Sequence, residues 1–199
     1  MVITKKIYKR IILVTGTPGV GKTAVSHLLT QKLSAKHIDL GELVRRENLI
    51  SGVDEARGTL IADTDKVSKR LKEIIRYSKR DLLIDGHYAV DVVPVEKIHL
   101  VFVLRRDPEE LKDLMEDRGF NEEKVRENLA AEILDICLFD AVKSCGLDKV
   151  CEIDTTGKEI EEVAEEALSV LRREKKCRVG VVDWLEKLER DGRLHNYFI

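Results

Sequence analysis

The segment LVTGTPGVGKTAV, at residues 13–25, constrains the fold of this chain more than any other part of it. An apolar run leads into a turn with three glycines and a proline, and a helical pattern follows at once. The motif G-x-x-x-x-G-K-T, from Gly16 to Thr23, is the complete phosphate-loop pattern between the strand and the helix that it requires. An ordinary glycine-rich turn is the alternative, and the combination of motif and context argues against it.

The residue types of this loop suit a nucleotide. Glycines let backbone N–H groups converge on one point, and the helix that begins near Gly21 adds unpaired N–H groups and the positive end of its dipole. Lys22 supplies a mobile positive charge for the β- and γ-phosphates, and the Thr23 hydroxyl can ligate Mg²⁺. We therefore expect ATP and Mg²⁺ as cofactors. The residues expected to hold the nucleotide are Gly16, Gly19, Val20, Gly21, Lys22, Thr23 and Ala24.

Short apolar runs alternate with long amphipathic stretches along the rest of the chain. The runs at 11–14, 82–85 and 99–104 are apolar enough to be strands buried on both faces, which is typical of a parallel sheet. Weaker strand candidates are 36–39 and 149–154, and helical patterns cover 23–33, 65–77, 107–118, 121–145 and 158–173. This alternation predicts an α/β fold: a three-layer, doubly wound parallel sheet of about five strands with right-handed crossovers.

Composition narrows the classes of function. The 199 residues include 35 Lys and Arg against 37 Asp and Glu, so no global basic field indicates nucleic acid, and direct nucleic-acid binding stays open. The cysteines form no Cys-x-x-Cys pair and have no histidine at zinc-finger spacing, which favours free thiols in a reducing compartment. We find no signal peptide and no apolar run near the roughly 18 residues of a membrane span. We expect a cytoplasmic protein with no membrane partner.

An acidic residue, Asp85, ends the predicted strand in LLIDGHY at 82–88. A buried carboxylate is costly without a charged partner. If this strand neighbours the phosphate-loop strand, Asp85 would hold Mg²⁺ through water. The alternative is an aspartate that caps the end of a strand. His87 lies two residues further on, and a catalytic and a structural role are equally open for it.

Four segments appear in the order and spacing of adenylate-kinase-like nucleoside monophosphate kinases: GTPGVGKT, LGELVRREN, DGH and VLRRDPEELKDLMEDRGFNEEKVRENLAAEI. Over about residues 10–173 the chain most resembles the small, broad-specificity branch of nuclei and archaea-type cells, which also acts in maturation of the small ribosomal subunit. The resemblance implies ATP-dependent phosphorylation of nucleoside monophosphates (AMP, CMP and others), with side ATPase activity and a role in rRNA processing. It implies a nucleoside monophosphate, a small-subunit ribosomal protein and the pre-ribosome as partners.

The resemblance also implies a monophosphate-binding segment at about 39–62. Within LGELVRREN, Arg45 matches the arginine that holds the phosphate of the acceptor. A guanidinium suits this role because it can grip phosphate oxygens in bidentate fashion. Arg46 lies about 100° away around the same helix, so the two side chains cannot point the same way. A solvated surface arginine is the alternative for each of them.

A short lid at about 117–127 is the second implied moving part. Arg118 matches an arginine that covers the phosphates of ATP. We expect Gly119 to end one helix and Asn121 to cap the next. Arg126 lies on a charged helix face, where an exposed position is the favoured interpretation.

Two departures from the family pattern shift the expected contacts. Ordinary adenylate kinases carry an arginine that packs on adenine four residues before the Arg118 position, where this chain has Leu114. Adenine contacts then depend on the loop DTTGK after the last strand, whose candidates, through backbone or stem contacts, are Thr156, Gly157 and Lys158. The segment DGHYAVD lacks the arginine that ends the usual Asp-Gly-Phe-Pro-Arg motif, so acceptor binding depends more on Arg45.

The helical pattern at 121–145 carries Asn128 and Glu132 one turn apart, and Asp135 continues the same line. We interpret this line as the solvent-exposed face of a helix and assign these residues no role.

The C-terminal residues 178–199 are expected to form a helical appendix to the kinase-like domain of residues 1–177. The pattern at 182–194 predicts a short helix, with Asp183 as its N-cap and Gly192 just past its end.

The implied reaction is direct in-line transfer of the γ-phosphoryl group of ATP to a nucleoside monophosphate. Its expected catalytic residues are Lys22, Asp85, His87 and Arg118. The main rival is an ATP-driven ribosome assembly factor, in which His87 positions a water molecule and hydrolysis releases a clamped ribosomal protein. A small-metabolite kinase is a weaker rival, because Arg45 and the lid pattern argue against it.

Overall fold

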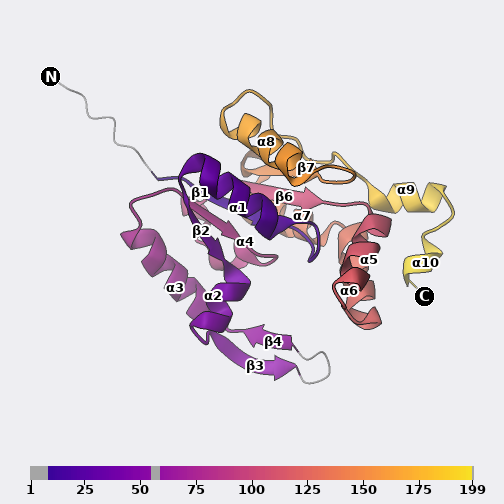
Figure 1. The fold of residues 1–199 in the computed structure, drawn as a ribbon, viewed down its shortest axis with the longest axis horizontal. Coiled ribbons are helices and arrows are strands. Elements are labelled where there is room, and N and C mark those ends of the chain that lie inside the picture. Colours follow the sequence, from indigo (N-terminus) through magenta and orange to yellow (C-terminus); the bar gives the residue numbers. More distant parts are fainter. Residues whose placement is uncertain (1–8, 55–58, 199) are drawn as a thin grey trace.

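A five-stranded parallel sheet with helices on both faces forms the body of the molecule in the computed structural model, which describes residues 9–54 and 59–198 (Figure 1). The strand order is β2-β5-β1-β6-β7. The strands are β1 (Ile11–Thr15), β2 (Lys36–Asp39), β5 (Leu82–Asp85), β6 (Leu100–Arg105) and β7 (Val150–Asp154). The predicted α/β class and the five predicted strands are confirmed, with ends that differ by at most one residue.

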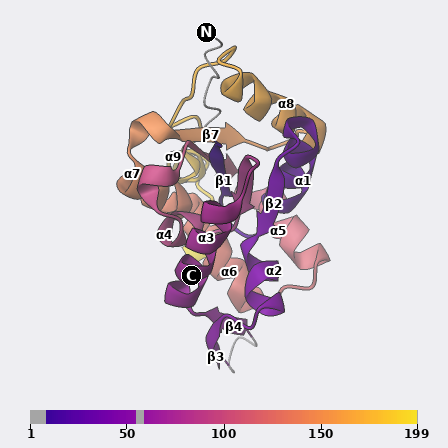
Figure 2. The same cartoon turned by 90° about the vertical axis from the view of Figure 1, so that its left-hand side faces the viewer.

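Both faces of the sheet are buried, as its apolar strands require. Side chains alternate along β1, so that Ile11 and Leu13 join one core while Ile12 and Val14 join the other. One core includes α2, α3, α4 and α7, and the other includes α1, α5, α6 and α8; Figure 2 shows α7 and α1 on opposite sides of β1. The helices are α1 (Lys22–Leu33), α2 (Leu40–Arg46), α3 (Thr64–Tyr77), α4 (Ala89–Val92), α5 (Pro108–Asp117), α6 (Glu122–Ile133), α7 (Ile136–Cys145) and α8 (Ile160–Leu171), with 3₁₀ turns η1 (Val95–Lys97) and η2 (Leu147–Lys149).

From the central strand β1 the chain first adds strands β2 and β5 on one side of the sheet and then adds β6 and β7 on the other. The neighbours of β1 are β5 on one side and β6 on the other, and Val14 pairs with Asp85 at the carboxyl end of β5. Ligands of doubly wound sheets bind at this kind of switch point, beyond the carboxyl ends of the strands. The α2 helix follows β2 and the α5–α6 pair follows β6, so both flank the same end of the sheet (Figure 1).

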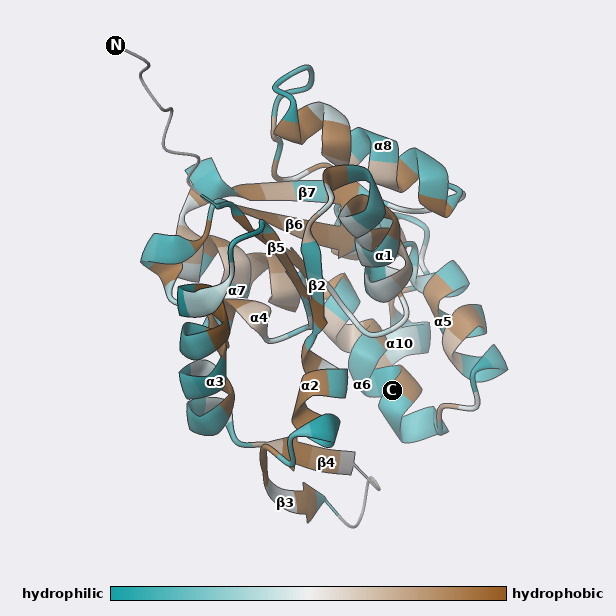
Figure 3. Ribbon diagram, turned by 60° about the vertical axis from the view of Figure 1, so that its left-hand side comes forward, coloured by the Kyte–Doolittle hydropathy of each residue, from teal (hydrophilic) through white to brown (hydrophobic). Residues whose placement is uncertain are grey.

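A hairpin that the sequence pattern did not reveal extends from α2. Its antiparallel strands are β3 (Ile50–Asp54) and β4 (Thr59–Ala62), and Figure 3 shows it standing apart from the main sheet. The hairpin lies within the predicted monophosphate-binding segment, of which residues 55–58 fall outside the described part of the chain.

The prediction of one continuous helix over 121–145 is wrong. The structure has two helices, α6 and α7, that meet at Leu134 and Asp135. Asp135 has a left-handed backbone with φ 56°, which no helix interior can contain. The guanidinium of Arg105 donates to the Glu132 carbonyl, which also accepts from the Asp135 backbone N–H at 3.2 Å, and it binds the Asp135 carboxylate as well. A contact between distant parts of the chain therefore stabilises the break.

The C-terminal appendix has the predicted helix, followed by a short one: α9 (Trp184–Arg190) and α10 (His195–Phe198). The Asp183 side chain caps α9 by accepting from the Glu186 backbone N–H at 2.8 Å, and Gly192 follows the helix with φ 66°. Trp184 and Leu188 pack against the end of α6. Within the described residues we find no helix with the length and apolar character needed to cross a lipid bilayer.

Candidate active site

The phosphate loop at residues 16–21 packs tightly against the end of β6 and the start of α5. Gly16 has φ 137°, and a Cβ atom at this position would lie 2.4 Å from the Leu104 carbonyl oxygen. A Cβ at Gly19, which has φ 102°, would lie 2.8 Å from Leu111. Any other residue at Gly16 would displace the loop from the sheet, because its Cβ would meet backbone. At Gly19 the Leu111 side chain can shift, and the positive φ is what favours glycine.

The Lys22 side chain curls over its own loop. Its Nζ donates to the carbonyl oxygens of Gly16 at 2.9 Å and Thr17 at 3.0 Å. Desolvation lowers the pKa of this ammonium, and the nearby acidic groups Cys137, Asp85 and Glu132 oppose that effect. Among the described residues no carboxylate forms an ion pair with Lys22. A desolvated cation without a carboxylate partner, at the start of a helix, fits an anionic ligand such as a nucleotide phosphate.

Asp85 meets Thr23 at the junction of β5 and α1. The Thr23 hydroxyl donates to Asp85 Oδ2 at 2.9 Å, and the Asp85 residue is only 2% exposed. These are hard oxygen donors of the kind that Mg²⁺ prefers, so the pair fits the ion expected from the sequence. The predicted proximity of Asp85 to the phosphate loop is therefore present in the structure.

His37 is a member of this site that the sequence did not indicate. Its Nε2 lies 2.7 Å from Asp85 Oδ1, because β2 pairs directly with β5. The ring of His37 also contacts that of His27 on α1, with centroids 4.5 Å apart. Only the strand order brings His37 to Asp85, and no motif around residue 37 announces it.

His87 lies on the rim of the site with an exposed side chain. Thr15 positions its backbone by donating to the His87 carbonyl at 3.1 Å, and its ring contacts Tyr88 edge to face. Partial desolvation, together with the charges of Lys22 and Lys124, lowers the pKa of His87 to about 4. The imidazole is therefore neutral near pH 7 and can both donate and accept a hydrogen bond.

Arg45 lies on α2, which Asp39 caps by accepting from the Glu42 backbone N–H at 2.8 Å. The guanidinium turns back along the helix, so that a Cβ at Gly41 would lie 3.6 Å from its Nη1. Desolvation and the charge of Asp39 raise the pKa of Tyr88, whereas the charge of Arg45 lowers this pKa. Arg45 is therefore close enough to Tyr88, in the loop after β5, to influence its ionisation. Arg45 makes no ion pair with any described residue.

The predicted lid has the expected helix–turn–helix form. Arg118 is the C-cap residue that follows α5, and Gly119 comes next with φ 73°. The Asn121 side chain caps α6 by accepting from the Lys124 backbone N–H at 2.8 Å. Arg118 is exposed and has no hydrogen-bond partner within the described part of the chain. Lys124, which the sequence did not single out, is half-buried and acts on the pKa of His87 across the site.

The loop after β7 holds its candidate residues through contacts within the protein. The Gly157 backbone N–H donates to the Glu110 carboxylate at 3.1 Å. Lys158 Nζ binds the Asp154 carbonyl at 2.7 Å and Glu166 on α8 at 3.0 Å. The Lys158 ammonium is thus bound to a side chain of α8. For this loop we still predict that adenine is contacted through backbone groups or the aliphatic stem of Lys158.

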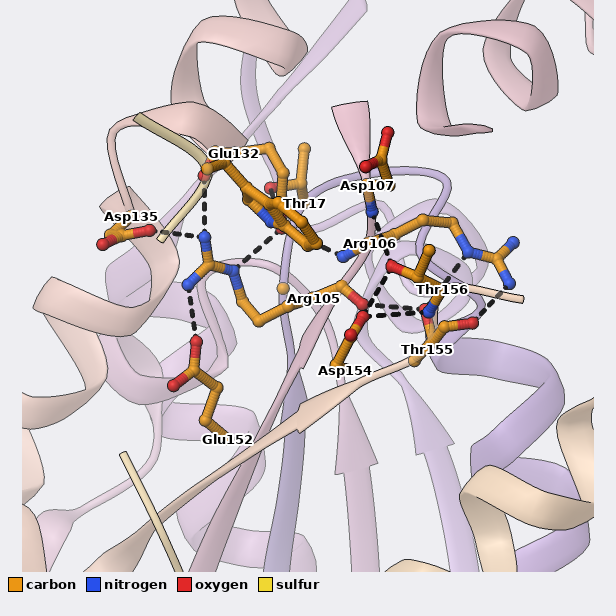
Figure 4. Close-up of polar contacts among 12 residues, drawn as sticks. Thr17, Arg105, Arg106, Asp107, Glu132, Asp135, Glu152, Asp154, Thr155 and Thr156 are labelled. Carbon is orange, nitrogen blue, oxygen red and sulfur yellow. Dashed lines mark hydrogen bonds and ion pairs between the residues drawn. The ribbon is translucent and has the colours of Figure 1, made fainter. Parts of the chain in front are cut away.

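A largely buried polar cluster connects the phosphate loop to the ends of β6 and α6, and we define it as Thr17, Arg105, Glu132, Asp135 and Glu152 (Figure 4). The expectation that Glu132 belongs to a solvent-exposed helix face is wrong, because only 1% of it is exposed. The side-chain amide nitrogen of Asn128 is also buried, and it has no hydrogen-bond partner among the described residues. Arg105 from the end of β6 and Trp184 from the C-terminal appendix cover this side of α6, which its sequence alone does not reveal.

Comparisons with known proteins show which families this chain is similar to. A family model described as an AAA domain matches residues 12–135. Three archaeal relatives share the name "Putative adenylate kinase". That of Methanocaldococcus jannaschii is 39% identical over 176 residues, covering 88% of this chain and 93% of the relative. Those of Methanosarcina barkeri and Thermococcus kodakarensis are 40% and 38% identical, covering 88% of this chain each and 98% and 93% of the relatives.

Solved structures support the fold alone. A gluconokinase from Sinorhizobium meliloti superimposes with a TM-score of 0.52 at 16% identity, covering 92% of this chain and 98% of that one. A sugar kinase from Janibacter superimposes with a TM-score of 0.54 at 17% identity, covering 83% and 95% of the two chains.

Proposed function

This chain belongs to the AAA-domain family and to the adenylate-kinase-like kinases, and we propose that it transfers the γ-phosphoryl group of ATP to a nucleoside monophosphate. The observation that carries this proposal is the Lys22 ammonium, held over the phosphate loop without a carboxylate partner among the described residues. AMP is the first acceptor to test. CMP and other monophosphates should be tested next, because the resemblance implies a broad acceptor specificity.

Phosphoryl transfer needs alignment and charge neutralisation more than covalent help from the protein. Lys22 neutralises the β- and γ-phosphates, and backbone N–H groups at the start of α1 bind the β-phosphate. Thr23 and Asp85 are the residues that would hold Mg²⁺, which when bound neutralises further phosphate charge. Arg118 is the lid residue proposed to cover the same phosphates.

Arg45 is the residue proposed to bind the acceptor. Its guanidinium lies near Asp39, since a Cβ at Gly41 would contact both side chains, and its charge acts on the pKa of Tyr88. The α2 helix, which carries Arg45, and the α5–α6 pair flank the same end of the sheet (Figure 1). Because the phosphate of a nucleoside monophosphate is already anionic, it can attack without a general base. The protein then has to hold it in line and exclude water, which would otherwise take the phosphoryl group.

ATP hydrolysis, coupled to assembly of the small ribosomal subunit, is the second candidate. The neutral imidazole of His87 favours hydrolysis, because it can orient a water molecule near Asp85. The ribosomal protein and the pre-ribosome enter this proposal only through the resemblance. The four free thiols favour a reducing compartment, for which we propose the cytoplasm.

One assay separates the two candidates. The purified protein is incubated with ATP and Mg²⁺ and with AMP, CMP, UMP, dAMP or GMP, and nucleoside diphosphate and free phosphate are measured together. Kinase function predicts that diphosphate formed from the acceptor exceeds free phosphate several-fold. Release of free phosphate at the same rate with and without every acceptor would contradict it. His87→Gly in the same assay is expected to lower hydrolysis more than transfer.

A further inference from the structure

We propose that Glu132 is a positioning residue of the phosphate loop, and that the C-terminal segment of residues 178–191 holds it in place through Trp184. The inference rests on the proposed function, because it assumes that the loop binds ATP. It assigns a role in nucleotide binding to the end of α6 and to the appendix, neither of which faces the phosphates.

The first step is the contact between Glu132 and the loop. The Thr17 hydroxyl donates to Glu132 Oε2 at 2.5 Å, and each residue is only 1% exposed. Thr17 follows Gly16, and its carbonyl is one of the two acceptors of Lys22 Nζ. A shift of Thr17 would therefore move both the loop backbone and the ammonium that is proposed to meet the phosphates.

The second step is the group that holds Glu132 itself. Arg105 Nε donates to Glu132 Oε1 at 2.8 Å, and the backbone N–H of Arg106 donates to the same oxygen at 3.1 Å. Through another nitrogen, Arg105 binds Glu152 at 2.7 Å (Figure 4). Charge-assisted hydrogen bonds of this kind leave a carboxylate little freedom. Glu132 thus presents a fixed acceptor to Thr17.

The third step is the connection to the appendix. Trp184 Nε1 donates to Glu132 Oε1 at 3.2 Å, so the indole contributes to the same carboxylate that holds the loop. The other oxygen of Glu152 accepts from the backbone N–H groups of Gly180 at 2.6 Å and Val181 at 2.8 Å. Lys187 on α9 adds an ion pair of 2.6 Å to Asp107, at the start of α5.

A purely structural ion cluster is the competing interpretation. Buried ion pairs are often no more stabilising than apolar residues of the same volume, so stability alone is a weak reason for this arrangement. The Thr17 hydroxyl distinguishes the two interpretations, because it joins the cluster to the loop rather than to the core. If the cluster positions the loop, replacing the Thr17 hydroxyl should weaken nucleotide binding more than it lowers the free energy of unfolding.

Three variants test this role. Thr17→Val keeps the shape of the side chain and removes the hydroxyl, Thr17→Ser keeps the hydroxyl, and Thr30→Val makes the same chemical change at a buried hydroxyl of α1 that has no partner among the described residues. Affinity for Mg²⁺ and the non-hydrolysable ATP analogue AMPPNP is measured by calorimetry. We expect binding about tenfold weaker in Thr17→Val, and close to wild type in Thr17→Ser and Thr30→Val.

The fluorescence of Trp184, the only tryptophan of the chain, gives a second readout. In the wild type and in Thr17→Ser we expect AMPPNP to change the Trp184 emission, and the midpoint of this change should fall at the AMPPNP concentration found by calorimetry. In Thr17→Val, saturating AMPPNP should change the emission much less. A merely structural cluster would not transmit this signal. Thermal unfolding shows whether each variant is folded at the temperature of the titrations.

The two proposals can fail separately. The role of Glu132 would be overturned if folded Thr17→Val bound AMPPNP with wild-type affinity. It would also be overturned if calorimetry detected AMPPNP binding to the wild type while its Trp184 emission did not change. Absence of AMPPNP binding by the wild type would overturn the proposed function and this inference with it. Tight binding with no phosphoryl transfer to any monophosphate would overturn the proposed function alone.

Discussion

The imidazole of His37 lies 2.7 Å from the carboxylate of Asp85, across two neighbouring strands of the sheet. The other oxygen of that carboxylate accepts the Thr23 hydroxyl, so Asp85 is held from both sides. Its orientation toward the proposed Mg²⁺ site then depends on a residue that lies 48 positions away in the sequence.

We predict that His37→Ala raises the Mg²⁺ concentration needed for half-maximal kinase activity several-fold, because Asp85 loses one of the two groups that orient it. Rates are measured against Mg²⁺ concentration at saturating ATP and AMP. His27→Ala is the matched control, since His27 contacts the His37 ring but has no bond to Asp85. An unchanged Mg²⁺ dependence in His37→Ala would contradict the prediction.

Lys22→Ala is expected to lower the rate of phosphoryl transfer at least 100-fold, about 3 kcal/mol in the barrier, because a preorganised cation at the transferring group is lost. The fold should remain, since Lys22 bonds only its own loop among the described residues. Steady-state kinetics and circular dichroism check the two parts. Lys32→Ala, at an exposed position of the same helix, should leave the rate unchanged. A Lys22→Ala rate within a few-fold of wild type would refute the assignment.

For Arg45→Ala we predict an acceptor KM that rises by about tenfold to a hundredfold, the range for a lost charge-assisted hydrogen bond, with little change in the KM for ATP. Arg46→Ala is the control, because the neighbouring guanidinium points elsewhere and contacts Glu47. Initial rates over a grid of ATP and AMP concentrations provide both constants. A large ATP defect, or an equal effect of Arg46→Ala, would show that Arg45 does not bind the acceptor.

His87 should make the stability of the protein depend on pH. Its pKa is about 4 in the folded state and near 6.5 in the unfolded state, so the unfolded chain binds the proton more readily. Stability contributed by neutral His87 is therefore complete above about pH 6.5 and is lost as pH falls toward 4. For the His87→Asn variant we predict a shallower loss between pH 7 and 5, with a difference below about 2 kcal/mol because the exposed ring is partly screened.

Denaturant unfolding of wild type and His87→Asn at several pH values measures this difference. Parallel stability profiles for the two proteins would mean that the His87 pKa is not depressed in the folded state.

Trp184→Phe is expected to lower the free energy of unfolding by about 1–2 kcal/mol, because the ring still packs on Ile133 and Leu188 while Glu132 loses one hydrogen-bond donor. Tyr197→Phe is the matched control in the same appendix, since that hydroxyl has no hydrogen bond within the described residues. Chemical unfolding followed by circular dichroism gives the comparison. Equal stabilities of the two variants would show that the indole N–H contributes nothing to the cluster.

Features that depend on local chemistry were predictable from the sequence. The phosphate loop is recognisable because its glycines are required by the backbone, and the strands because their apolar runs leave no polar face. The caps at Asn121 and Asp183 are confirmed because each satisfies N–H groups only three residues away. Each of these signals lies within a few consecutive residues.

Features that depend on distant contacts were decided by the tertiary structure. Glu132 has the spacing of an exposed helical position, and only the arrival of Arg105 from β6 and Trp184 from the appendix makes it a buried acceptor. His37 joins the site because β2 pairs with β5 rather than with another strand. A carboxylate or an imidazole can be exposed or buried at the same sequence spacing, because the cost of its burial depends on partners that local sequence does not specify.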